Sequence, residues 1–127
     1  MDLAFATVLV TVGQLLMGGL FVWAGLNHFG PAGEKLIPIL AARGIPQPRR
    51  ALYAASSFEA VCGACLMLGI AVAPVAIALV VFTIAVSVLL VNFWDMPEGD
   101  AREMLKTVWA SNSAIVGGLL VTAAGAL

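Results

Sequence analysis

Residues 3–29 read LAFATVLVTVGQLLMGGLFVWAGLNHF and contain no Asp, Glu, Lys or Arg. A membrane-crossing helix needs about 20 consecutive apolar residues, because a helix rises about 1.5 Å per residue and the hydrocarbon layer is about 30 Å thick. This stretch is long enough, and the Gly30-Pro31 pair that follows it would end a helix. Because Met1-Asp2 supplies no basic start of the kind that signal peptides have, we expect a retained membrane helix.

The rest of the chain has the same apolar character. Of the 127 residues, 62% are hydrophobic and 10% are charged, and the mean hydropathy is +1.07. A water-soluble domain of this length could not bury so much apolar surface. Three more apolar stretches follow, so the sequence predicts one all-α domain, an integral membrane four-helix antiparallel bundle. The expected spans are residues 3–29, 51–70, 72–94 and 103–126.

Two charged connections separate these spans. Residues 30–50 are expected to be an amphipathic loop with a short segment on the bilayer surface, and residues 95–102 a second loop. The surface segment would consist of Leu36, Ile37, Ile39 and Leu40. All six basic residues lie in or beside the two loops. The positive-inside rule therefore predicts that both loops are cytoplasmic and that both termini face the opposite side of the membrane. A net charge of −1 is not typical of a protein that binds nucleic acid.

Small residues recur at spacings that suit close packing of helices. They are Gly18 and Gly25 in the first span, Ala51 and Ala55 in the second, and Ala110, Ala114 and Gly118 in the fourth. In lipid, small side chains let two helix backbones approach each other. These positions predict contacts inside the bundle or with a further copy or partner.

Glu59 is the only acidic or basic side chain deep inside an apolar stretch. A charged side chain in the middle of a membrane helix costs about 2.5–3.5 kcal/mol on insertion scales, so such a residue usually has a partner or a function. Counting about 1.5 Å per residue from the helix ends puts Glu59, Asn112 and Ser87 at nearly the same depth. We therefore predict a polar layer across the bundle. Such a layer can hydrogen-bond a neutral carboxyl group, the form that apolar surroundings favour.

This layer has two interpretations, a structural pin or the polar end of a pocket. A pocket would hold an amphipathic ligand or pass a proton, with Glu59 as the relay. Its mouth would be lined from the basic side of the bundle by Asn27, His28, Asn92 and Trp94. Histidine is the side chain that changes charge near neutral pH, and His28 is the only one in the chain. The candidate ligand-binding residues are therefore Glu59, Asn112, Ser87, Asn27, His28, Asn92 and Trp94.

Cys62 and Cys65 form a C-x-x-C pair, which predicts either packing or redox chemistry. Residues three apart on a helix are neighbours, so the two thiols could cycle between dithiol and disulfide. Apolar surroundings, however, leave little of the reactive thiolate, and buried cysteines commonly serve in packing. Other signatures are absent from the sequence. With one histidine, no Gly-rich phosphate loop and no Ser/His/Asp set, we expect no metal site, no intrinsic cofactor and no independent catalysis.

Several short motifs occur in a fixed order along the chain. They are Gly19-Leu20-Phe21-Val22-Trp23-Ala24-Gly25-Leu26-Asn27-His28-Phe29, Gly44-Ile45-Pro46-Gln47-Pro48, Glu59 followed by Gly63, Leu66 and Leu68-Gly69, Asn92-Phe93-Trp94, Asn112 and Gly117-Gly118. In this order and spacing they resemble the DoxX family of small four-helix bacterial membrane proteins, over nearly the whole chain.

The resemblance implies four helices, a glutamate in the second span, and association with redox systems such as thiosulfate:quinone oxidoreductase or detoxifying enzymes. The leading hypothesis is a non-catalytic subunit or anchor of a redox enzyme complex in a bacterial inner membrane, with both termini periplasmic. Quinone or a lipid head group would be the ligand of the Glu59 layer. The partners would be membrane lipids and either a redox protein or a further copy of the chain. Two alternatives stay open, a membrane thiol oxidoreductase that uses Cys62 and Cys65, and a small transporter or structural scaffold.

Overall fold

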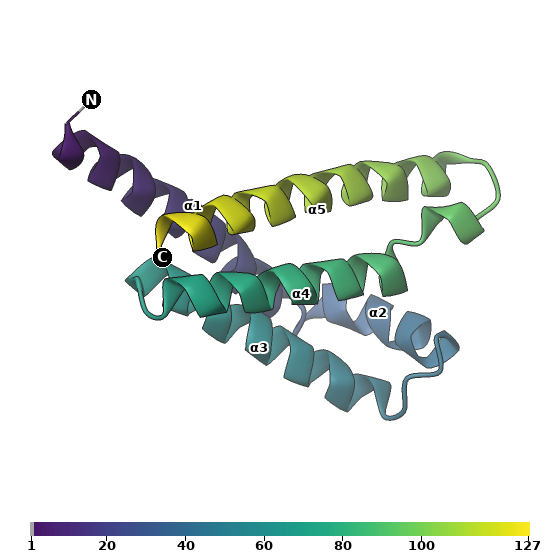
Figure 1. Ribbon diagram of the computed structural model, residues 1–127. Coiled ribbons are helices and arrows are strands. Elements are labelled where there is room, and N and C mark those ends of the chain that lie inside the picture. Colours follow the sequence, from purple (N-terminus) through teal and green to yellow (C-terminus); the bar gives the residue numbers. More distant parts are fainter. Residues whose placement is uncertain (1) are drawn as a thin grey trace.

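The computed structural model describes residues 2–127, and every regular element in this range is a helix. The elements are α1 (Leu3–Asn27), α2 (Pro31–Ala42), α3 (Pro48–Leu68), α4 (Val72–Leu90), the short 3₁₀ helix η1 (Phe93–Asp95) and α5 (Asp100–Gly125) (Figure 1). The helices α1, α3 and α5, and α4 with its extension through η1, are each long and apolar enough to cross a membrane. The chain is therefore an all-α membrane bundle, as the sequence predicts.

The connections between the long helices alternate between two ends of the bundle. The helix α2, the helix η1 and the loop before α5 lie at one end, and the α3–α4 turn, the start of α1 and the end of α5 lie at the other (Figure 1). All six Lys and Arg residues belong to the first of these ends. We call it the basic end, and it consists of α2, residues 43–50, η1 and the first two turns of α5.

The helices α1 and α3 pack closely because glycines face each other across their interface. A Cβ atom added to Gly63 of α3 would lie 2.6 Å from the carbonyl oxygen of Gly18, and a Cβ atom added to Gly18 would collide with the carbonyl oxygen of Gly63. Nearer the basic end, a Cβ atom added to Gly25 would lie 2.6 Å from the carbonyl oxygen of Ser56. In lipid, such close backbone contact is a main source of helix association. It fixes the position of α3 against α1.

The packed core lies in the half of the bundle away from the basic end. Phe21, Leu66, Leu79 and Leu119 are all buried there. The helix α5 buries only Leu119 and Ala123, both in its second half, so its first half is less tightly packed. The outside of the bundle carries large apolar side chains, as a surface in contact with lipid requires.

Residues 31–42, which we expected to be part of a loop, form the helix α2. Pro31 occupies its first position, where a missing N–H costs nothing. The helix ends in a Schellman motif, in which Gly44 adopts a positive φ of 81° and the N–H of Ile45 donates to the carbonyl oxygen of Leu40 at 3.2 Å. Leu40 is buried and Leu36 is half-buried, so one face of α2 packs on the bundle.

Candidate ligand-binding site

One face of α3 is buried and carries Glu59. The buried residues follow one another at alternate spacings of four and three, which places them on one stripe of a helix. They are Leu52, Ser56, Glu59, Gly63 and Leu66. Glu59 is 8% exposed, so the one deeply placed acidic side chain of the chain turns away from lipid.

His28 follows α1 directly and lies beside Glu59. The Nδ1 atom of His28 is 3.7 Å from the Oε2 atom of Glu59, a distance that suits an ion pair or a bridging water better than a direct hydrogen bond. A Cβ atom added to Gly33 would collide with the carbonyl oxygen of His28, so α2 lies directly on the backbone there. The His28 side chain is 30% exposed and that of Glu59 is 10% exposed. The pair therefore connects the bundle interior with the basic end.

Glu59 and His28 line a cavity of about 540 Å³ in the basic half of the bundle. Side chains from α2, α3, α4 and α5 form most of its wall, and these are mainly apolar, as with Leu40, Phe82 and Leu105. The polar side chains on the wall are His28, Ser56, Glu59 and Asn112. Ligand sites in proteins are commonly of this size and combine an apolar wall with a few polar groups.

Asn112 joins α5 to α4 at the level of the cavity. Its Nδ2 atom donates a hydrogen bond to the Oγ atom of Ser87 at 3.0 Å. Ser87 is not on the wall of the Glu59 cavity, but both residues line a smaller pocket of about 190 Å³ with Trp109. Asn112 thus lines both cavities, and its hydrogen bond to Ser87 links α5 to α4 there.

The family model described as DoxX matches residues 5–92 of this chain, which is well over half of its length. The chain belongs to the DoxX family. No curated protein and no solved structure matched it.

In this DoxX-family chain, the match covers α1 to α4 and ends at Asn92. His28 and Glu59 therefore lie inside the matched range. The resemblance that we drew over nearly the whole chain also used Trp94, Asn112 and Gly117-Gly118, and these lie beyond it. The α5 side of the cavity therefore rests on the structure alone.

Four predicted residues of the DoxX-family chain lie outside the cavity wall. Ser87 lines only the smaller pocket. Asn27 is exposed. Asn92 is buried beyond the end of α4, where it accepts a hydrogen bond from Arg43 Nη2 at 2.6 Å and donates one to Asp95 Oδ2 at 3.1 Å. Trp94 is 46% exposed and packs edge-on against Trp109. Asn92 therefore ties the end of α2 to α4, and Trp94 belongs to an aromatic cluster at the basic end.

The two cysteines are free, half-buried thiols on α3. Cys62 packs against the core around Phe21 and Leu66. Neither Cys62 nor Cys65 is on the wall of the Glu59 cavity. Within residues 2–127, no group of three or more His, Cys, Asp and Glu side chains could hold a metal ion.

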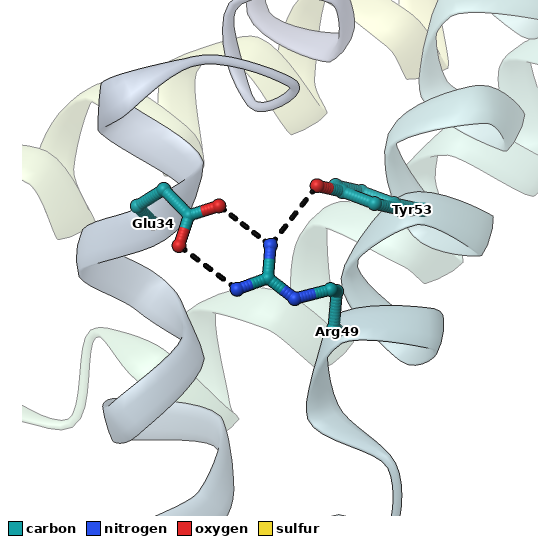
Figure 2. Close-up of polar contacts among 3 residues, drawn as sticks. All are labelled: Glu34, Arg49 and Tyr53. Carbon is teal, nitrogen blue, oxygen red and sulfur yellow. Dashed lines mark hydrogen bonds and ion pairs between the residues drawn. The ribbon is translucent and has the colours of Figure 1, made fainter.

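A network of side chains fastens α2 over the cavity. Arg49 donates two hydrogen bonds to the Glu34 carboxylate, at 2.5 Å and 3.0 Å, and a third to the Tyr53 hydroxyl at 3.1 Å (Figure 2). The Tyr53 ring also stacks on Phe29 with 5.1 Å between ring centroids. This network joins the end of α1, α2 and α3. Since Leu36 and Leu40 of α2 are part of the cavity wall, the network supports that wall.

Glu34→Gln is expected to loosen α2. Hydrogen bonding from Arg49 holds the pKa of Glu34 below its usual value of 4.5, so the ion pair stabilises α2 above pH 4.5 and is lost as the pH falls through the lowered pKa. The pair is exposed, so we expect hydrogen-exchange protection of residues 31–42 to change only about twofold. After correction for the pH dependence of intrinsic exchange, the protection of residues 31–42 should fall at acid pH in the wild type. In Glu34→Gln it should be equally low at every pH. Equal protection in both proteins at neutral pH would contradict this role.

Counting depth along the helices puts Ser56 within a turn of the Glu59 layer, but Ser56 was not among the candidate ligand-binding residues. The α2 residues of the wall and the Arg49 network were not among them either. Ser56 stands three residues before Glu59 and therefore on the same side of a helix, which was a usable signal. The pairing of Glu34 with Arg49 depends on the fold of residues 30–50. No local pattern in that segment indicates which charges meet.

Proposed function

We propose that this chain is an accessory subunit of a redox enzyme complex in the bacterial inner membrane, not catalytic on its own, and that the Glu59 cavity binds a quinone. What supports the binding role is one observation, the Glu59–His28 pair on the wall of a largely apolar cavity of about 540 Å³. The redox setting rests on the DoxX resemblance described above. The basic end would face the cytoplasm, as the positive-inside rule favours.

The division of the cavity wall suits an amphipathic ligand. A quinone has a flat head group with carbonyl oxygens and a hydrocarbon tail. The head group would lie near Glu59, His28 and Asn112, and the tail would lie along apolar side chains such as Leu40 and Phe82. A lipid with a small polar head would fit the same polar and apolar parts of the wall. The experiment below must therefore distinguish a bound lipid from a bound quinone.

The Glu59–His28 pair would exchange protons with the bound head group. Reduction of a quinone to a quinol consumes electrons and protons, and the electrons would come from the partner enzyme. Glu59 would give a proton to a quinone oxygen and recover it through the more exposed His28 from the basic end. A carboxyl and an imidazole group are the side chains that most often carry out such transfers.

Filling the apolar part of the cavity tests this proposal. Ala55 lines the cavity, whereas its neighbour Ala54 is exposed on the outer surface of α3. The wild type, Ala55→Phe and Ala54→Phe would be purified gently from native membranes, and the extracted quinones and lipids quantified by mass spectrometry. We expect quinone to be enriched in the wild type and in Ala54→Phe relative to bulk membrane, and about tenfold lower in Ala55→Phe.

Three results would contradict the proposal in different ways. If the quinone-to-lipid ratio in the purified wild type equals that of the bulk membrane, quinone is not the ligand. If instead one lipid class is enriched and Ala55→Phe removes it, the cavity is a lipid site. Equal quinone content in both variants would move the site elsewhere on the protein. The unfolding temperature of each variant shows whether a loss of ligand reflects a loss of fold.

A further inference from the structure

Ser56 has a side-chain oxygen that is completely buried and has no hydrogen-bond partner in the protein. Leaving a buried hydroxyl group unpaired costs free energy, so an unpaired hydroxyl in a packed protein usually faces a water or a ligand. Two other buried polar atoms among the described residues share this state, Thr83 Oγ1 and Arg102 Nε. Of the three residues, only Ser56 lines the cavity that contains Glu59.

The usual way to satisfy a helical hydroxyl is not used by Ser56. A Ser or Thr in a helix commonly donates to the carbonyl oxygen one turn earlier. In this chain Thr7, Thr107, Ser113 and Thr122 all do so, at 2.8–3.3 Å. Ser56 makes no such bond, although it lies well inside α3. Its hydroxyl group is therefore unpaired within the protein, on a residue of the cavity wall. Because the oxygen is covered in the structure, the side chain must rotate to meet a molecule in the cavity.

The backbone holds Ser56 in a fixed position. Its carbonyl oxygen lies where Gly25 of α1 has no side chain, only 2.6 Å from where a Cβ atom would be. Leu52 and Glu59, one turn away on either side, are also buried. A polar group on a rigid element with a fixed environment is well suited to select a ligand.

We propose that the Ser56 hydroxyl donates a hydrogen bond to a carbonyl oxygen of the ligand head group and so selects oxygen-bearing amphipaths over hydrocarbon. This inference rests on the proposed function of the cavity and adds to it a specificity-determining residue. Ser56 would bind the head group in either protonation state of Glu59, because a hydroxyl group can donate without changing its charge. The selected class is a neutral, lipid-soluble molecule with at least one acceptor oxygen, of which a quinone is an example.

The test compares Ser56→Ala with Ser57→Ala, since Ser57 is the adjacent residue and is exposed on the outside of α3. The probes are 2-decyl-1,4-benzoquinone and decylbenzene, which have the same chain length and differ in the head-group oxygens. Binding of each probe to the full chain would be titrated by native mass spectrometry in one detergent. Ser56→Ala should weaken decylbenzoquinone binding about fivefold, the effect of one hydrogen bond, and leave decylbenzene binding unchanged. Ser57→Ala should change neither.

Stability provides a second measurement. Because the Ser56 hydroxyl has no partner within the protein, Ser56→Ala without ligand should unfold at the same temperature as Ser57→Ala, or higher. A clearly lower unfolding temperature would show that the hydroxyl is structural and would overturn the inference. So would unchanged decylbenzoquinone binding in Ser56→Ala, or an equal loss of both probes.

Failure of the proposed function would be recognised separately. If the wild type binds decylbenzoquinone no better than Ala55→Phe does, the quinone assignment fails. The amphipaths extracted from purified wild type, Ser56→Ala and Ser57→Ala then decide the role of Ser56. An oxygen-bearing amphipath lost only from Ser56→Ala would support the inference, and identical contents in all three would overturn it.

Discussion

Gly18→Ala is expected to destabilise the protein by about 1–3 kcal/mol, the range for overpacking a tightly packed interface. The added methyl group would collide with the carbonyl oxygen of Gly63 and would lie 2.7 Å from Met67 Cγ and 2.9 Å from the Met67 backbone nitrogen. Two of these three neighbours are backbone atoms, so α1 and α3 must move apart. Unfolding in mixed micelles, followed by circular dichroism as SDS is added, would measure the loss.

The matched control for this variant is Gly19→Ala. A Cβ atom added to Gly19 would meet nothing within 4 Å, although the residue is adjacent to Gly18 on the same helix. It should therefore be as stable as the wild type or more so, because alanine favours a helix over glycine by roughly 1 kcal/mol. If both variants had the same stability, the close α1–α3 packing would be wrong, and with it the position of His28 beside Glu59.

Glu59→Gln is expected to lower quinone-linked turnover of the assembled complex by about tenfold or more, because a positioned proton donor typically contributes about 10²–10⁴-fold. Glutamine has nearly the same size and keeps a hydrogen-bonding group, but it cannot release a proton. The assembled amount of protein should therefore be preserved. The rate of quinol formation in membrane vesicles, divided by the amount of assembled complex, measures the effect.

Glu98→Gln is the control for this second prediction, because Glu98 is an exposed carboxylate in the loop before α5. Its turnover should equal that of the wild type. Wild-type turnover in fully assembled Glu59→Gln would exclude the proton role of Glu59. Quinone binding could still hold in that case, since the apolar wall and Ser56 do not depend on a proton transfer.

The membrane bundle could be predicted from the sequence because apolar length and charge placement act locally. Each span can be recognised from its own apolar composition, as residues 3–29 show. The inward orientation of Glu59 also follows from a local cost, since lipid contact would be unfavourable. Counting depth along helices placed Asn112 level with Ser87, and these two residues are hydrogen-bonded.

The parts that depend on which helices meet could not be predicted in this way. Gly18 and Gly25 do lie against α3, as their spacing suggests, but the α3 residue that faces Gly18 is Gly63 and not the predicted Ala51 or Ala55. Ala110 and Ala114 of α5 are exposed. Regularly spaced small residues indicate that another helix can pack closely against the backbone. They do not indicate which helix does so, because that depends on the arrangement of the whole bundle.

The basic end was the hardest part to predict, because its geometry depends on long-range pairs of polar side chains. Asn92 was expected at the mouth of a pocket. Its side-chain oxygen instead accepts a hydrogen bond from Arg43, 49 residues earlier in the chain. Likewise, Glu34 meets Arg49 only because residues 31–42 fold as a helix beside α3. Charge patterns in a connecting segment do not specify such pairs.

Modification of Glu59 by dicyclohexylcarbodiimide, located by mass spectrometry of the chain, tests the central claim most directly. This membrane-soluble reagent adds to protonated carboxyl groups in apolar surroundings. Glu59 should be modified in bilayers, and 2-decyl-1,4-benzoquinone should slow the reaction in the wild type and in Ala54→Phe but not in Ala55→Phe. A rate that is the same with and without the quinone in all three proteins would contradict a ligand cavity at Glu59.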